Sequence, residues 1–141
     1  MNLNQLNERV KADLSYIGFS NQSWVTPTIH PEGHVYDVII VGGGQSGLST
    51  AFALLRERIS NVLILDENPA GYEGPWITYA RMFTLRTPKQ LPSIDLGIPS
   101  LTFQAWWRAQ YGEEGWEALD KIPRHEWMNY LKWYREVLNL P

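Results

Sequence analysis

The chain contains no cysteine among its 141 residues. Disulfide bonds, thiolate metal ligands and cysteine nucleophiles are therefore excluded, and a cytoplasmic location is the expected one. No apolar run approaches the roughly 20 residues that a helix needs to cross a bilayer. Residues 1–9 also lack the basic start and apolar stretch of a secretory signal. We therefore expect a soluble protein that does not bind membranes.

Charge of either sign is also sparse. Charged residues make up 19% of the chain, and the formal net charge is −3. This balance argues against a general nucleic-acid binder and against a protein of anionic membrane surfaces. Hydrophobic residues make up 44%, which predicts a globular chain with a real core.

A glycine-rich run follows directly on an apolar stretch near residue 40. Residues 36–41 are predicted to form a strand buried on both faces of a parallel sheet. The strand leads into Gly42, Gly44 and Gly47, which have the spacing G-x-G-x-x-G. In such a motif Gly42 permits the sharp turn, Gly44 lets the backbone approach a pyrophosphate, and Gly47 lets the next helix lie against the sheet. Gln45 and Ser46 begin that helix, so their backbone N–H groups would face the phosphates; the alternative for Ser46 is a simple helix cap.

An acidic residue ends the second predicted strand. The helix is expected over residues 46–58 and the strand over 62–66, with Asp66 about 20 residues after the glycines, where ribose hydroxyls would lie. Glu67 is adjacent, but pleating should turn it to the opposite face, so Asp66 is preferred. Strand, glycine turn, helix, strand and acid together predict a site for the ADP half of a dinucleotide. The alternative is a purely structural glycine turn.

The remaining segments predict helices and loops. Residues 1–34 are interpreted as an N-terminal helix, over residues 2–17, followed by a connector, and residues 35–141 as the nucleotide-binding domain. Loops are expected over 67–100, a helix over 103–111 closed by Gly112, and a last helix from about Pro123 to residue 138. Most of the seven tryptophans lie between Trp106 and Trp133. We interpret them as core packing in these helices, the alternative being a stacking surface for a ligand.

Two strong strands are too few for a complete doubly wound sheet, which usually has about five or six. Either weak strands lie in the proline-rich middle, or the chain is the N-terminal portion of a longer one. We favour the second interpretation.

The stretches YDVIIVGGGQSGLSTAFAL, NVLILDENPAG and GPW resemble the N-terminus of FAD-dependent oxidoreductases. More narrowly they resemble the flavin-containing monooxygenase-like group, over about residues 36–138. The resemblance implies an α/β fold: an incomplete Rossmann-like βαβ FAD-binding unit with additional helices. It implies FAD at this first glycine motif. It also implies an NADPH-binding glycine motif further along in full-length relatives, which this sequence lacks.

The resemblance also extends to the loop that follows the second strand. In that family a Gly-Gly-x-Trp element follows the acid; here the matching stretch is 73–76, with Glu73 in place of the first glycine. The resemblance implies that Trp76 walls the isoalloxazine ring, with ordinary packing as the alternative. It implies that Arg86 and Thr87 touch the cofactor, with a solvated loop as the alternative. No residue is assigned as catalytic, and no metal site is predicted.

The resulting functional hypothesis is the FAD-binding portion of an NAD(P)H-dependent flavoprotein oxidoreductase. The resemblance implies monooxygenase-like flavin hydroperoxide chemistry on a small-molecule substrate in the full-length enzyme, with the isolated chain inactive. One alternative is a flavin reductase or dehydrogenase that transfers hydride without oxygen insertion. Another is a non-catalytic dinucleotide-binding module whose tryptophan-rich helices form a partner surface. The oligomeric state stays open.

Overall fold

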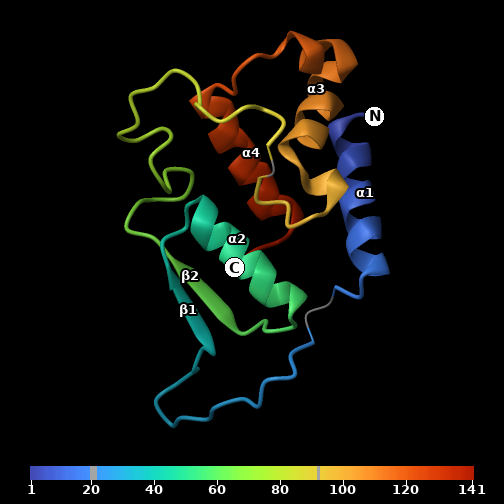
Figure 1. Cartoon of the computed structure of the whole chain (residues 1–141). Coiled ribbons are helices and arrows are strands. Elements are labelled where there is room, and N and C mark those ends of the chain that lie inside the picture. Colours follow the sequence, from blue (N-terminus) through green and yellow to red (C-terminus); the bar gives the residue numbers. More distant parts are fainter. Residues whose placement is uncertain (20–21, 92) are drawn as a thin grey trace.

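A parallel strand pair and a group of helices make up the fold (Figure 1). The computed structural model describes residues 1–19, 22–91 and 93–141. In chain order the elements are α1 (Leu3–Tyr16), β1 (Val38–Val41), α2 (Gln45–Arg56), β2 (Val62–Leu65), the short 3₁₀ helix η1 (Pro99–Leu101), α3 (Phe103–Ala118) and α4 (Arg124–Val137). The strands pair in parallel, with Val38 opposite Val62 and Val41 opposite Leu65. The predicted βαβ unit is therefore confirmed.

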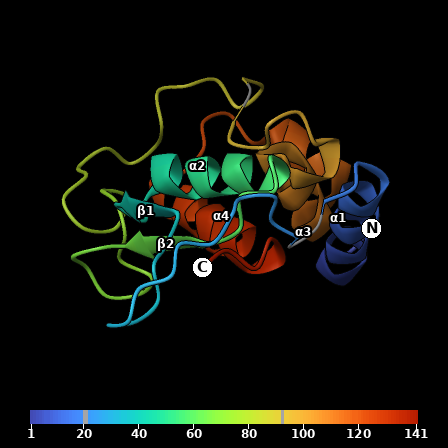
Figure 2. The ribbon, with the colours of Figure 1, turned by 90° about the horizontal axis from the view of Figure 1, so that it is seen from below.

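Helix α2 covers one face of this sheet. Its apolar residues recur at helical spacing, and the face predicted from that spacing is buried: Leu48, Ala51, Phe52 and Leu55. Figure 2 shows α2 running from the strands at one end of the molecule toward α1 at the other. The crossover thus places the N-terminus of α2 beside the carboxyl ends of both strands.

The prediction that the first strand is buried on both faces is wrong. The side chains of Ile39, Val41 and Leu65, which alternate with those facing α2, are 52%, 86% and 47% exposed. The physical reason is that α2 covers one face only, whereas an apolar parallel strand is buried when helices cover both. The sheet therefore presents an open apolar face.

The helices form a core around α4, in which aromatic rings predominate. Tyr130 is fully buried, and its ring centroid lies 5.1 Å from that of Trp127, 5.5 Å from that of Phe103 and 5.9 Å from that of Trp106. The interpretation of the tryptophans as core packing is confirmed for those between positions 106 and 133, all of which belong to the core cluster or pack against it.

Helix α1 packs against α3 and η1 at the end of the molecule remote from the sheet (Figures 1 and 2). It buries Leu6, Val10 and Leu14 in the same core. The indole Nε1–H of Trp133 donates to Asn7 Oδ1 at 2.7 Å, which ties α1 to α4. Within the described ranges no helix has the length and apolarity to traverse a bilayer.

Gly112 interrupts α3 but does not end it. The residue adopts φ 70° and ψ −177°, as the predicted helix stop requires, yet the chain re-enters helical geometry and continues to Ala118. Burial of Trp116 in the core draws this second segment onto the molecule. Tertiary packing therefore extends the helix beyond the expected range of 103–111.

Candidate functional site

Two glycines of the motif are required by the protein backbone itself. Gly42 has φ 110°, a conformation that side chains disfavour. A Cβ on Gly47 would lie 1.8 Å from the carbonyl oxygen of Gly42, an impossible overlap. Gly44 is different, because a Cβ there would meet the nearest protein atom, Gly74 Cα, at an ordinary 3.5 Å. None of the residues that the structure describes requires glycine at position 44, whereas close approach of a ligand would.

The glycine turn leaves a row of donors free at the start of α2. Gly44 is the N-cap and supplies no side-chain hydrogen bond, so the alternative that Ser46 caps the helix is wrong. The N–H groups of Gly44, Gln45 and Ser46 donate to no acceptor among the residues that the structure describes. Unpaired N–H groups at a helix N-terminus form a site for anions such as phosphates.

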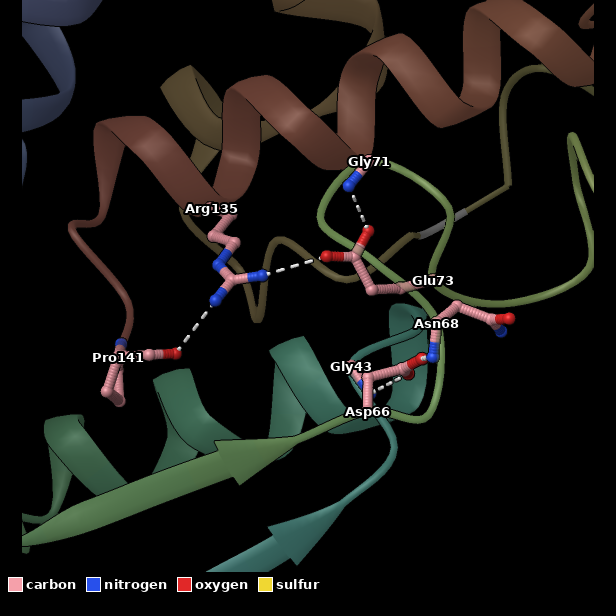
Figure 3. Close-up of polar contacts among 7 residues, drawn as sticks. All are labelled: Gly43, Asp66, Asn68, Gly71, Glu73, Arg135 and Pro141. Carbon is pink, nitrogen blue, oxygen red and sulfur yellow. Dashed lines mark hydrogen bonds and ion pairs between the residues drawn. The ribbon is translucent and has the colours of Figure 1, made fainter.

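Asp66 directly follows β2 and faces the glycine turn (Figure 3). Its Oδ2 accepts from the N–H of Gly43 at 2.7 Å, and its Oδ1 accepts from the N–H of Asn68 at 2.8 Å. These two backbone donors, that of Gly43 first, lower the pKa of the carboxyl below its ordinary value. Asp66 is therefore an oriented anion at neutral pH, with acceptor capacity left for ribose hydroxyls.

This pKa direction predicts a pH-dependent contribution to stability. The folded-state pKa of Asp66 lies below the unfolded value, so its stabilisation is present above the unfolded pKa and is lost as pH falls through the folded-state pKa. Asp66→Asn should therefore lower the free energy of unfolding at pH 7, and the deficit should shrink at about pH 3. Urea unfolding of the original protein and of Asp66→Asn at pH 7 and at about pH 3 measures this deficit. Glu67→Gln, which removes a charge one residue away, is the control; a deficit independent of pH would contradict the prediction.

A cavity of about 760 Å³ lies at the carboxyl ends of the strands. It brings together four of the predicted residues: Gly42, Gly44, Asp66 and Glu67. Pleating does not turn Glu67 away from this cavity, because β2 has already ended at Leu65. Gly74, from the stretch 73–76 that matches the family element, also lines it, together with Asn68 and Tyr79, which the sequence interpretation missed.

A second cavity, of about 440 Å³, is lined by other residues that the sequence predicts to bind the cofactor. These are Gln45, Trp76, Arg86 and Thr87, and Trp127 of α4 lies with them. The indole Nε1–H of Trp127 donates to Gln45 Oε1 at 2.9 Å, so the side chain of Gln45 matters as well as its backbone. The buried Nε1–H of Trp76 has no hydrogen-bond partner in the described ranges. A buried donor beside a cavity suits a ligand that carries an acceptor.

The loop between β2 and the second cavity crosses the glycine turn. Gly74, with φ 74°, approaches Gly44, and Glu73 approaches Gly43. Glu73 is only 7% exposed; it accepts from the N–H of Gly71 at 2.9 Å and pairs with Arg135 of α4 at 3.1 Å (Figure 3). The sequence interpretation noted Glu73 only as a departure from a glycine pattern and missed Arg135.

Comparison with known proteins extends this picture. A family described as FAD-NAD(P)-binding matches residues 39–139, a range that contains both cavities' predicted residues. The chain is 64% identical to a FAD-dependent urate hydroxylase of Xanthomonas campestris pv. campestris over 141 residues. That alignment covers 100% of this chain and 30% of the hydroxylase.

Two further relatives match shorter stretches. The beta subunit of sarcosine oxidase from Rhizobium meliloti is 45% identical over 53 residues, which are 36% of this chain and 13% of the subunit. The flavin-containing amine oxidase A of Equus caballus is 38% identical over 65 residues, 46% of this chain and 11% of the oxidase. No solved structure matches the chain. The predicted resemblance to FAD-dependent oxidoreductases and the prediction of FAD as cofactor are confirmed, and the chain belongs to the FAD-NAD(P)-binding family.

Proposed function

We propose that this chain is the FAD-binding part of a flavin-dependent monooxygenase that hydroxylates a small molecule, with urate as the first substrate to test. The observation that carries the proposal is the row of free N–H groups at Gly44, Gln45 and Ser46 beside the oriented carboxylate of Asp66. The identity of 64% to a FAD-dependent urate hydroxylase over the whole chain supports the reaction class.

The residues fit an FAD molecule extended over both cavities. The N–H row would hold the diphosphate, and Asp66 would accept from the adenosine ribose. A carboxylate at that position disfavours a 2′-phosphate, which favours FAD over NADP at this turn. The cavity lined by Trp76, Arg86 and Thr87 has a mainly apolar lining, which suits the flavin ring. When bound, the flavin supplies the redox chemistry; the protein binds and orients it.

We further propose that NAD(P)H and substrate bind to a polypeptide region beyond these 141 residues. The chain spans 30% of the length of the urate hydroxylase. The open apolar face of the sheet, with Ile39, Val41 and Leu65, is suited to cover by further structure. The 141 residues contain no second glycine motif of the G-x-G-x-x-G type for a nicotinamide cofactor.

The absorbance spectrum of the purified protein tests the cofactor. We expect a flavin absorbance band at about 450 nm in the purified protein, or a band that appears and is retained after incubation with FAD and gel filtration. NAD, given in the same way, is the control ligand and should not be retained. A colourless protein that FAD does not saturate would support the non-catalytic module without flavin and end the proposal.

Oxidation of NADPH by the complete enzyme tests the reaction. A monooxygenase should consume NADPH and oxygen in a substrate-dependent way when urate is added, whereas a reductase or dehydrogenase should oxidise NADPH without incorporating oxygen. Transfer of labelled oxygen into the product separates the two. Substrate oxidation without incorporated label would favour the second candidate.

A further inference from the structure

Two carboxylates flank the glycine turn at Gly43. A Cβ built on Gly43 would lie 3.5 Å from Asp66 Oδ2 and 3.2 Å from Glu73 Cγ. Asp66 is satisfied by backbone N–H groups, as described above. Glu73 is nearly buried, in a position where the diphosphate of a dinucleotide would bring further negative charge close to it. Like charges in a partly desolvated site repel strongly unless a cation compensates them.

Arg135 supplies that cation from α4. Its Nη1 lies 3.1 Å from Glu73 Oε1, while the other carboxylate oxygen accepts from Gly71 (Figure 3). Its Nη2 also donates to the carbonyl of Pro141 at 3.2 Å, which restricts the guanidinium. Glu73 and Arg135 line a further cavity, of about 540 Å³. The other charged side chains that line it are Lys132 and Glu136, and both are exposed.

The ion pair lies where a loop crosses the glycine turn. Residues 70–75 turn sharply at Gly71 and Gly74, whose φ angles are 89° and 74°, and so bring Glu73 and Gly74 against Gly43 and Gly44. The Glu73 side chain links this loop to α4.

We propose that Arg135 neutralises Glu73, which lies against the glycine turn, so that a dinucleotide diphosphate can bind there. Arg135 acts through Glu73, and the proposal rests on the proposed function. It predicts that an unpaired Glu73 is worse for binding than no charge at either position.

FAD affinity in a double-mutant cycle tests this proposal. By titration calorimetry, Arg135→Gln should bind FAD at least about tenfold more weakly, because Glu73 stays charged beside the diphosphate. Glu73→Gln should bind within about threefold of the original, since its amide oxygen still accepts from Gly71. Arg135→Lys should be intermediate. The double variant should recover to within about threefold of the original. A merely structural role would not give this recovery, because the double variant also lacks the ion pair.

The control is Lys132→Gln, which removes the same charge from α4 one turn away. It should leave FAD affinity unchanged; a loss equal to that of Arg135→Gln would show that only the general positive potential matters and would overturn the proposal. So would unaltered binding in Arg135→Gln, or a double variant as weak as Arg135→Gln. If Arg135→Gln fails to fold, the double variant is the test. A folded double variant that does not bind FAD would overturn the proposal. Absence of FAD binding by the original protein would instead end the proposed function.

Discussion

Replacing Gly47 with alanine should unfold the βαβ unit and abolish FAD binding together. The new Cβ would lie 1.8 Å from the carbonyl oxygen of Gly42 and 3.0 Å from its carbon, so no side-chain rotation relieves the overlap. The backbone of the turn or the first turn of α2 must move, and Leu48 would leave its buried position with it. Overpacking of this kind costs about 3 kcal/mol or more in the free energy of unfolding.

Urea unfolding followed by circular dichroism measures the loss. Thr50→Ala, three residues further along the exposed side of α2, is the control and should change stability by less than about 0.5 kcal/mol. A Gly47→Ala protein as stable as the original would mean that the helix does not pack as closely on the turn as described.

Replacing Gly44 with alanine should separate binding from folding. A Cβ at this position meets the protein only at 3.5 Å, and the residue has ordinary extended dihedral angles, φ −75° and ψ −169°. The fold should therefore lose no more than about 1 kcal/mol, the usual cost of replacing an N-cap glycine. FAD affinity should fall by about tenfold or more, because the methyl group occupies space that the diphosphate needs. The Gly44→Val variant should bind less FAD than Gly44→Ala does.

Flavin occupancy after purification, from the ratio of visible to ultraviolet absorbance, measures this effect. Asp66→Ala provides a second arm, since it removes the ribose acceptor and leaves the turn free of added bulk. Full occupancy in Gly44→Val or in Asp66→Ala would show that the cofactor site has been assigned to the wrong residues.

The features that local sequence determines were predictable. The spacing of Gly42, Gly44 and Gly47 after an apolar run indicates a strand, a turn and a helix start from neighbouring residues alone. The same is true of the buried face of α2, which follows from helical periodicity alone. Asp66 was predictable because it directly follows the second apolar run, at the edge of the sheet where the glycine turn also lies.

The features that depend on distant partners were not predictable. The exposure of Ile39 depends on which elements cover the sheet, and no local pattern encodes that. The hydrogen bond between Trp127 and Gln45 joins positions 82 residues apart, and that between Arg135 and Glu73 joins positions 62 residues apart. In sequence, Arg135 looks like any polar residue on the surface of an amphipathic helix.

The anchoring of α1 has a kinetic consequence. Two side-chain hydrogen bonds join α1 to distant parts of the chain. Asn7 accepts from Trp133, 126 residues away, and Asp13 accepts from Ser100, 87 residues away. Closing loops of such length lowers the conformational entropy of the chain before any stabilising contact forms. Folding therefore slows as the mean sequence separation of contacting residues grows. We therefore expect α1 to dock late in folding, although it precedes the rest of this fold in sequence.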